Sequence, residues 1–321
     1  MKNRLLIIFG VALLLLVIGL MIKDAVQKPG IDTNPYEYSL DNFTEIGISE
    51  LCYSNTKTIE VPIETLRGIA RDKQDRVYVC GKDKVLIFDP YLEKIEEFEI
   101  SGEARNIHIT EADLVLLGMY DHIEILDLKG KPAATWESYN ERSVITSIAS
   151  DDNYIYVADA GNKIVLQYDY NGDLKQEIGK KDSLIDRPGF IIPSAYFDLA
   201  IGRQGELWAV NSGLHSFESY SDQGKFISSW KKTSMTLDGF SGCCNPTHFA
   251  MLSDGSYVTS EKGLVRVKIH EPNGNYRCVV ARPNDFSEEE EGIDLLVNSK
   301  DDIFLIVPGE KQIRKYSLIS E

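Results

Sequence analysis

A pattern of short apolar strands separated by tight polar turns recurs along most of this chain. In its best copy, residues 157–173, the first strand ends at Asp159 and a turn carries Gly161 and Asn162 before the second strand begins. Another tight turn at Gly172 leads into a third strand. One such sheet cannot bury both of its faces alone, so the repetition predicts neighbouring copies that stack around an axis.

The most apolar strand of each copy sets the spacing of the repeats. Six such strands follow one another at intervals of roughly 37 to 52 residues, the spacing expected of propeller blades. They are residues 77–79, 114–116, 155–157, 207–209, 257–259 and 303–305. Each is preceded by a shorter strand and followed by one that alternates apolar and polar residues, as strands do. The sequence therefore predicts an all-β fold with six blades.

The two ends of the repeat region complement each other. The sixth copy ends after its third strand, near residues 313–318, whereas residues 56–61 form a good outer strand that belongs to no copy. Pairing these two segments would close the ring and leave only short, protected edges. We therefore expect residues 56–321 to form a six-bladed β-propeller.

The best copy also carries a recognisable pattern. Its Asp159, Asn162, Ile164 and Gly172 resemble the NHL repeat, and the architectural resemblance extends from residue 56 to the C-terminus. NHL-repeat proteins are mostly binding platforms, and a few enzymes use related six-bladed scaffolds. The resemblance thus implies an NHL-like propeller that binds a partner, although a fold alone does not fix a function.

The N-terminus predicts a location. Residues 5–22 form an uninterrupted apolar run of 18 residues behind a basic tail. As a helix this run would be about 27 Å long, enough to cross a bilayer core. The basic tail predicts that residues 1–24 are a cytoplasmic tail and transmembrane anchor, that 25–55 are a stalk, and that the propeller lies on the extracytoplasmic side of the cell membrane. The alternative is a cleaved signal peptide, but no clear cleavage pattern follows the run.

The charge of the chain argues against one class of partner. The formal net charge is −16, and the acidic residues are spread over the turns. A soluble acidic surface explains this distribution. A nucleic-acid-binding protein would need a basic stripe, which the sequence lacks, so we expect no nucleic-acid partner.

The chain has five cysteines: Cys52, Cys80, Cys243, Cys244 and Cys278. In an oxidising compartment the adjacent Cys243 and Cys244 could form a vicinal disulfide, our first expectation. They could instead bind a soft metal together with His248, or act in redox chemistry. A third interpretation is ordinary pairing with a distant cysteine such as Cys278, or free thiols.

Two connections between blades are unusually long. They are residues 180–194 and 231–247, and each joins the outer strand of one blade to the inner strand of the next. Such joints lie on one face of a propeller, and long ordered loops on a rigid scaffold often carry function. The second connection contains Cys243, Cys244 and Asn245, which we expect to contribute to a rigid binding loop. The alternative is simple decoration of the blades.

Aligning the inner strands predicts a ring of residues around the axis. The ring positions are Gly68, Asn106, Ser147, Asp198, His248 and Asp294. Of these, Asp198, His248 and Asp294 could hold a divalent cation, a type of axial site similar to that of six-bladed lactonases and amidating lyases. Gly68 departs from that pattern because it offers no ligand atom. The alternative is that the ring is a solvated channel lining.

No catalytic motif of a hydrolase, nucleotide-binding or metalloprotease type occurs in the sequence. The leading hypothesis is a platform that binds a protein, peptide or glycan. The first alternative is a hydrolase or lyase with an axial divalent cation, and the second is a redox accessory protein. The residues expected to bind a ligand are Asn106, Ser147, Asp198, His248, Asp294, Cys243, Cys244 and Asn245.

Overall fold

The computed structural model describes residues 2–27, 41–183, 187–287, 290 and 292–319, with the backbone alone at 2–8, 24–27 and 41–42. The chain divides into two compact units, Met1–Asn42 and Phe43–Glu321. Residues 28–40 of the expected stalk, with their Pro29-Gly30 and Asn34-Pro35 pairs, lie outside the described residues.

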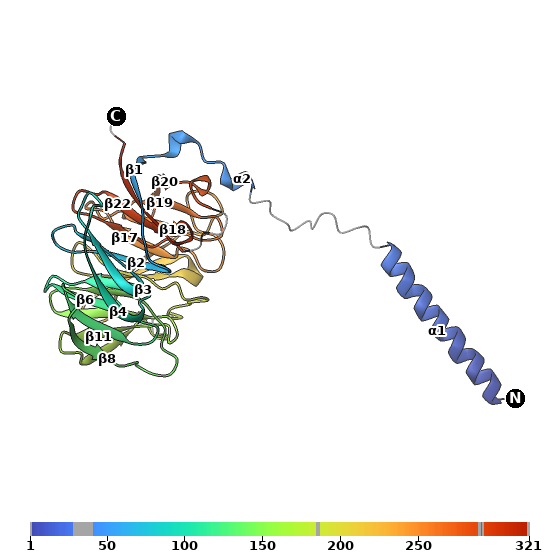
Figure 1. Cartoon of the computed structure of the whole chain (residues 1–321). Coiled ribbons are helices and arrows are strands. Elements are labelled where there is room, and N and C mark those ends of the chain that lie inside the picture. Colours follow the sequence, from blue (N-terminus) through green and yellow to red (C-terminus); the bar gives the residue numbers. More distant parts are fainter. Residues whose placement is uncertain (1, 28–40, 184–186, 288–289, 291, 320–321) are drawn as a thin grey trace. The chain divides into compact units, whose positions relative to one another are not determined.

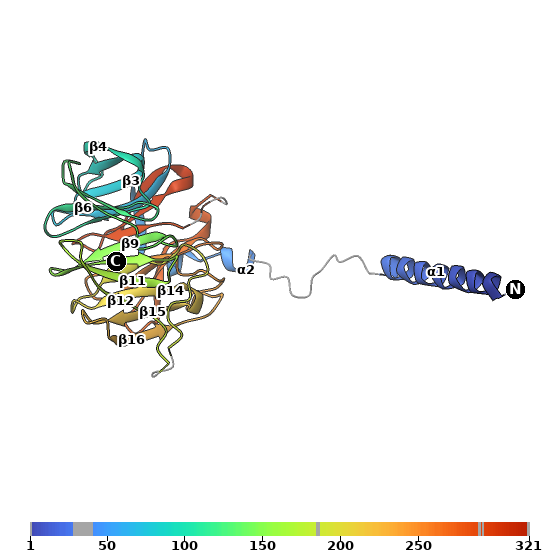
Figure 2. The ribbon, with the colours of Figure 1, turned by 90° about the horizontal axis from the view of Figure 1, so that it is seen from below.

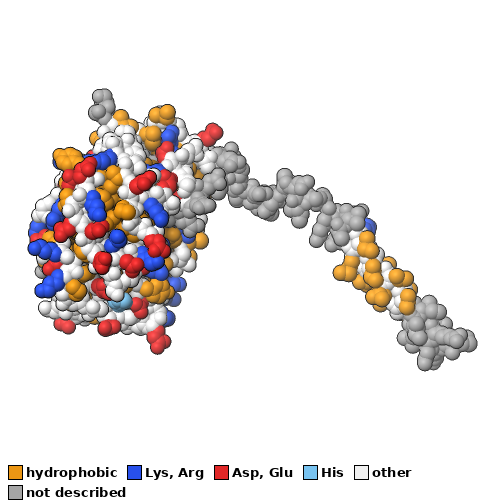
Figure 3. Space-filling view, in the orientation of Figure 1, with side chains coloured by type: hydrophobic (Ala, Val, Ile, Leu, Met, Phe, Trp, Pro, Cys, Tyr) orange, Lys and Arg blue, Asp and Glu red, His pale blue; other side chains and the backbone are white. Residues whose placement is uncertain are grey.

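The first unit contains the helix α1 (Lys2–Gln27). Its described large apolar side chains, such as Phe9, Leu15 and Met21, are exposed, and they give this helix its hydrophobic surface in Figure 3. Among the residues whose side chains are described, no helical stretch reaches the length and hydropathy of a membrane span.

The second unit is a β-propeller of six sheets, five with four strands and one with three. Blades 1 to 3 are β2 (Leu66–Arg71), β3 (Val77–Phe88) and β4 (Lys94–Glu103); β5 (Asn106–Ile109), β6 (Leu114–Gly118), β7 (Ile123–Asp127) and β8 (Pro132–Trp136); and β9 (Ile145–Ser150), β10 (Tyr154–Asp159), β11 (Ile164–Asp169) and β12 (Leu174–Ile178). Blades 4 to 6 are β13 (Leu199–Ile201), β14 (Leu207–Asn211), β15 (Ser216–Tyr220) and β16 (Phe226–Lys231); β17 (His248–Met251), β18 (Tyr257–Glu261), β19 (Arg266–His270) and β20 (Tyr276–Ala281); and β21 (Leu295–Val297), β22 (Ile303–Val307), β23 (Gln312–Leu318) and β1 (Tyr53–Glu60). The predicted all-β six-bladed fold is confirmed (Figures 1 and 2).

Short helical turns accompany the strands. Before β1 lie α2 (Asp41–Thr44) and the 3-10 turn η1 (Ile48–Glu50). Within the propeller, η2 (Ser212–Leu214), η3 (Pro283–Asp285) and η4 (Pro308–Glu310) occupy connections between strands.

Acidic residues build the hairpins on one face of the propeller. In blade 3 the Asp169 carboxylate accepts the N–H groups of Asn171 at 2.9 Å and Asp173 at 3.0 Å, and Gly172 has a positive φ of 89°. In blade 2 the Asp127 carboxylate likewise accepts the N–H groups of Lys129 and Lys131. A turn of this kind inserts a bulge at the end of the hairpin, which explains the register shifts between the third and fourth strands.

Blade 1 departs from the four-strand pattern because β3 combines the expected second and third strands. Its first part, as far as Gly81, pairs with β2, and its second part, from Lys82, pairs with β4. The chain changes direction at Asp83, whose φ is 64°.

The ring closes where the sequence predicted. β1 pairs antiparallel with β23, and Ile59 lies opposite Ile313. A disulfide joins Cys52, the residue before β1, to Cys278 in β20 of blade 5, with a Cα–Cα distance of 5.9 Å. The N-terminal strand is thus fixed to both of the last two blades.

Apolar side chains fill the spaces between blades. At the closing joint, Val79 and Leu86 of blade 1 pack with Phe304 and Ile306 of blade 6. Each sheet therefore buries both of its faces, as stacked repeats require. The surface carries acidic and basic side chains side by side (Figure 3).

The disulfide predicts a measurable stabilisation. Cys52 and Cys278 are 226 residues apart, and loop-closure entropy for so long a loop would contribute up to about 5 kcal/mol. Replacing both cysteines by serine should lower the free energy of unfolding by about 2–5 kcal/mol in urea denaturation. The double variant should also become insensitive to reductant, whereas the wild type should lose the same stability on reduction. Equal stability of both proteins would refute this role.

Candidate functional site

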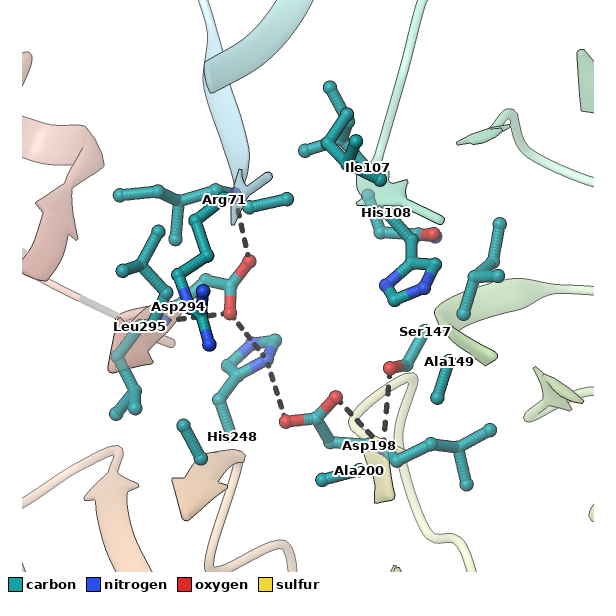
Figure 4. Close-up of a pocket in the computed structure, with 18 of the residues that line it drawn as sticks. Arg71, Ile107, His108, Ser147, Ala149, Asp198, Ala200, His248, Asp294 and Leu295 are labelled. Carbon is teal, nitrogen blue, oxygen red and sulfur yellow. Dashed lines mark hydrogen bonds and ion pairs between the residues drawn. The ribbon is translucent and has the colours of Figure 1, made fainter. Parts of the chain in front are cut away.

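The predicted ring lines a cavity of about 310 Å³ on the propeller axis. Five of its six positions contribute: Asn106, Ser147, Asp198, His248 and Asp294. Figure 4 shows several of these side chains facing a common space. Small residues two positions further along, among them Ala149 and Ala200, line it too. The sequence alignment of the inner strands thus placed these residues correctly around the axis.

Gly68, the sixth position, has a packing role. A Cβ at this residue would lie 2.9 Å from the Cα of Asn106 and 3.0 Å from the sulfur of Cys80. Blades 1 and 2 therefore approach so closely here that a side chain would have to displace backbone. This explains why the first blade offers no ligand atom.

The acidic ring residues join neighbouring blades. Asp198 of blade 4 accepts the N–H of Phe249 in blade 5 at 2.8 Å, and Asp294 of blade 6 accepts the N–H of Ile69 in blade 1 at 3.1 Å. Each carboxylate also accepts the N–H of the residue that follows it. These bonds satisfy backbone groups that would otherwise face the axis unpaired.

The neutral ring residues do the same more weakly. The Ser147 hydroxyl accepts the N–H of Leu199 at 3.2 Å, and the Asn106 amide donates to the carbonyl of Ile145 at 3.5 Å. The buried Oδ1 of Asn106 has no hydrogen-bond partner among the described residues. Inter-blade hydrogen bonding is thus a role of the ring that the sequence analysis missed.

His248 lies between the two carboxylates. Its Nδ1 is 3.8 Å from Asp198 Oδ2 and 3.6 Å from Asp294 Oδ1. Its ring stands edge-on to that of Tyr196, with centroids 5.9 Å apart. Burial raises the pKa of Asp294 to about 6, with His248 opposing this shift and the negative charge of Asp198 adding to it. The three groups form an acid–imidazole cluster on the axis.

This cluster contains the three expected metal ligands. Within the described part of the chain, no group of three His, Cys, Asp or Glu side chains is arranged to hold a metal ion. Backbone N–H groups occupy both carboxylates, and the imidazole lies between them. A metal-ligand role for Asp198, His248 and Asp294 stays a prediction.

A second hollow, of about 260 Å³, opens above His248 on the face with the long connections. Arg67, Arg105 and Tyr196 line it, together with Gly292. His248 borders both hollows, so it marks the passage from this mouth to the axial cavity. A ligand that entered from this face would meet aromatic and basic side chains first.

Buried charges anchor the long connections on this face. In the first, the Arg187 guanidinium contacts the buried carboxylate of Glu218 and the hydroxyl of Tyr220, and it lies 3.5 Å from the centre of the Phe226 ring. Residues 184–186 of this connection lie outside the described residues. The remainder is fixed by an ion pair that is shielded from water.

The second connection is held from blade 5. Arg266 donates to the carbonyls of Met235 and Thr236, and the Lys268 ammonium contacts that of Gly239. Glu261 pairs with Lys268 at 2.9 Å and with Arg266 at 2.7 Å. Burial lowers the pKa of Lys268 to about 8, although Glu261 opposes this shift.

A third connection, residues 282–293, follows the same plan. Arg314 donates to the carbonyl of Asp285 and lies 5.5 Å from the ring of Phe286. Glu218, Lys268 and Arg314 are each the third residue of their strand, where blades 2 and 3 have Ile125 and Leu166. Comparing the third strands of the repeats would have revealed these anchors in the sequence.

The cysteines of the second connection are free thiols in the structure. The sulfurs of Cys243 and Cys244 are 3.1 Å apart, whereas a disulfide needs about 2.05 Å. The vicinal disulfide therefore stays a prediction, whereas pairing with Cys278 is wrong because Cys278 binds Cys52. Burial raises the pKa of the Cys244 thiol, which disfavours thiolate chemistry at this residue.

Asn245 fixes the end of the same connection. It is buried, its amide donates to the carbonyls of Ser241 at 2.7 Å and Lys262 at 3.0 Å, and its Oδ1 accepts the N–H of Lys262 at 2.9 Å. The structure thus places Asn245 within the loop framework, while Cys243 remains exposed on its surface.

The comparisons with known proteins concern the fold. No protein family matches the chain, and no curated protein matches its sequence. Virginiamycin B lyase from Staphylococcus aureus is similar in structure, with a TM-score of 0.59 and 12% identity over 83% of this chain and 100% of that one. The WD40 β-propeller domain of Doa1 gives a TM-score of 0.55 and 14% identity over 78% of each chain. At this identity the likeness shows the propeller fold alone, and the NHL resemblance is not confirmed.

The raised pKa of Asp294 predicts a pH-dependent loss of stability. The folded state retains this proton up to a pH of about 6, whereas the unfolded chain releases it near 4, so stability falls as pH rises through this window. The loss should reach about 3 kcal/mol for this buried group. Asp294→Asn should remove it, so the free energy of unfolding of the wild type relative to the variant should be lower at pH 7 than at pH 4. A difference that does not change with pH would contradict the assignment.

Proposed function

We propose that this protein is a membrane-anchored, extracytoplasmic propeller that binds a protein, peptide or glycan on the face with the long connections. The observation that carries the proposal is the anchoring of three neighbouring connections on one face by buried charges. An ion pair holds the first connection, and hydrogen bonds from charged side chains to backbone carbonyls hold the other two, so that each loop is fixed in one conformation. A loop that is already ordered loses less entropy when a partner binds.

The mouth offers the chemistry of a recognition site. Arg105 lies 4.5 Å from the ring centre of Tyr120, and Lys262 lies 4.7 Å from that of Tyr196. Aromatic and arginine side chains are enriched at interfaces because they combine a large contact area with directional polar groups. The unpaired Oδ1 of Asn106 and the imidazole of His248 lie deeper, where an extended group from a partner could reach them.

Two features support the proposed location. The apolar run of residues 5–22 falls within α1, and its described side chains are exposed. The disulfide between Cys52 and Cys278 is typical of proteins in oxidising compartments. Both favour a propeller outside the cytoplasm, attached by its N-terminal helix.

The location can be tested with reporter fusions. A C-terminal reporter that is active only outside the cytoplasm should be active and should sediment with membranes, because residues 5–22 would act as an uncleaved anchor. A reporter that is active only in the cytoplasm is the matched control and should be silent. Reporter activity in the soluble extracytoplasmic fraction would show cleavage, and a cytoplasmic signal would refute export.

The binding face can be tested by site-specific photocrosslinking in intact cells. A photoreactive phenylalanine at Ala195, which is exposed at the mouth, should give a discrete adduct with the partner. The same group at Gln204, which is exposed in the hairpin between β13 and β14 on the other face, serves as the control. Adducts from Gln204 alone, or equal adducts from both positions, would refute the assignment of the face.

A lyase or hydrolase is the second candidate. The observation that favours it is the cluster on the axis, where His248 lies within 4 Å of two carboxylates and Asp294 has a raised pKa. Groups with perturbed pKa values in a cavity are candidates for general acid–base catalysis. Two of the proteins similar in structure, virginiamycin B lyase and a streptogramin B lyase with 13% identity and a TM-score of 0.59, are lyases by name.

A further inference from the structure

Another hollow, of about 400 Å³, lies on blade 3, and its lining differs from that of the axial site. One wall is the segment of residues 139–142 that leads into β9. The turn between β10 and β11 forms a second wall, and the two ends of the 180–194 connection form the third. Its volume falls in the range of small-molecule sites, about 300–1,000 Å³.

The lining of this hollow is strongly basic. It includes Arg142, Lys163, Lys180 and Lys181. Lys180 pairs with Glu177 at 2.8 Å, but the side chains of the other three make no hydrogen bond or ion pair with any described residue. Three exposed cations without an ion-pair partner among the described residues thus surround one hollow, in a chain whose net charge is −16.

Some surface lysines elsewhere on the propeller have local partners. Lys73 pairs with Asp113 at 2.7 Å, and Lys82 pairs with Glu64 at the same distance. What distinguishes Arg142, Lys163 and Lys181 is that they surround one hollow, where together they create a positive potential that favours an anion.

A rigid framework carries two of these cations. The amides of Asn140 and Asn162 donate to each other at 3.0 and 3.1 Å, and Asn162 also donates to Asp159 at 2.7 Å. A Cβ on Gly161 would lie 1.7 Å from the carbonyl oxygen of Arg142, so only glycine permits this contact between the two segments. The NHL-like pattern of this blade thus holds Arg142 and the adjoining turn together.

The opposite wall is equally well fixed. The backbones of Asp182 and Arg187 pair through two hydrogen bonds of 3.0 and 2.8 Å, which close the base of the 180–194 connection beside Lys181. Arg187 in turn is anchored on Glu218. The charged ends can move to meet a ligand, while the backbone that carries them stays in place.

We propose that this hollow binds a phosphate-bearing ligand through Arg142, Lys163 and Lys181. The guanidinium group presents a planar fork that matches two phosphate oxygens, and lysine ammonium groups neutralise the remaining charge. A soluble phosphate ester and the headgroup of a phospholipid share this chemistry. The site is separate from the axial mouth, so either assignment can fail without the other.

The test uses the purified full chain in a non-ionic detergent, with pyrophosphate as the probe in isothermal titration calorimetry. The wild type should bind it saturably, and the affinity should fall as salt increases, because exposed charges are screened. The triple variant Arg142→Gln, Lys163→Asn, Lys181→Gln should bind at least tenfold more weakly. Asparagine is chosen at Lys163 because this residue has a positive φ of 57°.

A matched control removes three exposed lysines elsewhere on the propeller. The variant Lys129→Gln, Lys131→Gln, Lys300→Gln changes the net charge equally and should bind pyrophosphate like the wild type. Equal loss in both variants would show a general charge effect and overturn the site. Absence of saturable binding by the wild type, or tighter binding of citrate than of pyrophosphate, would overturn the phosphate assignment.

A comparison of two further probes identifies the source of the phosphate. Short-chain phosphatidic acid, used below its micelle concentration, should bind more tightly than glycerol phosphate if the ligand is a lipid headgroup. Equal affinities assign the site to a soluble phosphate ester. Either outcome supports the site, provided that the triple variant no longer binds the probe.

Discussion

Closure of the ring is the constraint on which the rest of this structure depends. Each sheet is apolar on both faces and is stable only between two neighbours. An open stack would therefore expose to water the faces by which blades 1 and 6 contact each other. The antiparallel pairing of β1 with β23 removes this exposure by placing the start of the propeller in its last blade. Packing of Val79 and Leu86 on Phe304 then completes the joint, and the disulfide at Cys52 keeps the closing strand beside blade 5.

Closure of the ring also determines the hydrogen bonding around the axis. Six inner strands converge there, and the backbone N–H groups at their first residues need acceptors. Asp198 and Asp294 supply them across the joints between blades, which places two carboxylates close enough to share an imidazole. The acid–imidazole cluster is therefore part of the scaffold, and any catalytic use of it would draw on groups that also hold the blades together.

Periodicity in the sequence predicted the strand order, the closing pair and the ring positions, because each depends on alternation and spacing that repeat from blade to blade. Features that join distant segments escaped it. The partner of Cys52 lies 226 residues away, and no local pattern connects the two. The use of Asp198 by the backbone of Phe249 is likewise invisible in one sequence, and it competes with the metal-ligand role that the residue types suggested.

The two faces of the propeller differ in the length of their connections and in how their charged residues are used. On the hairpin face the acidic residues are consumed by turns, as Asp127 and Asp169 are by the N–H groups that follow them. On the other face the connections are longer, and buried charges such as Lys268 hold them from below. On this face, Arg142, Lys163 and Lys181 form no ion pair with a described residue. Because these three cations gather around one hollow, they create a local positive potential that would favour an anionic ligand.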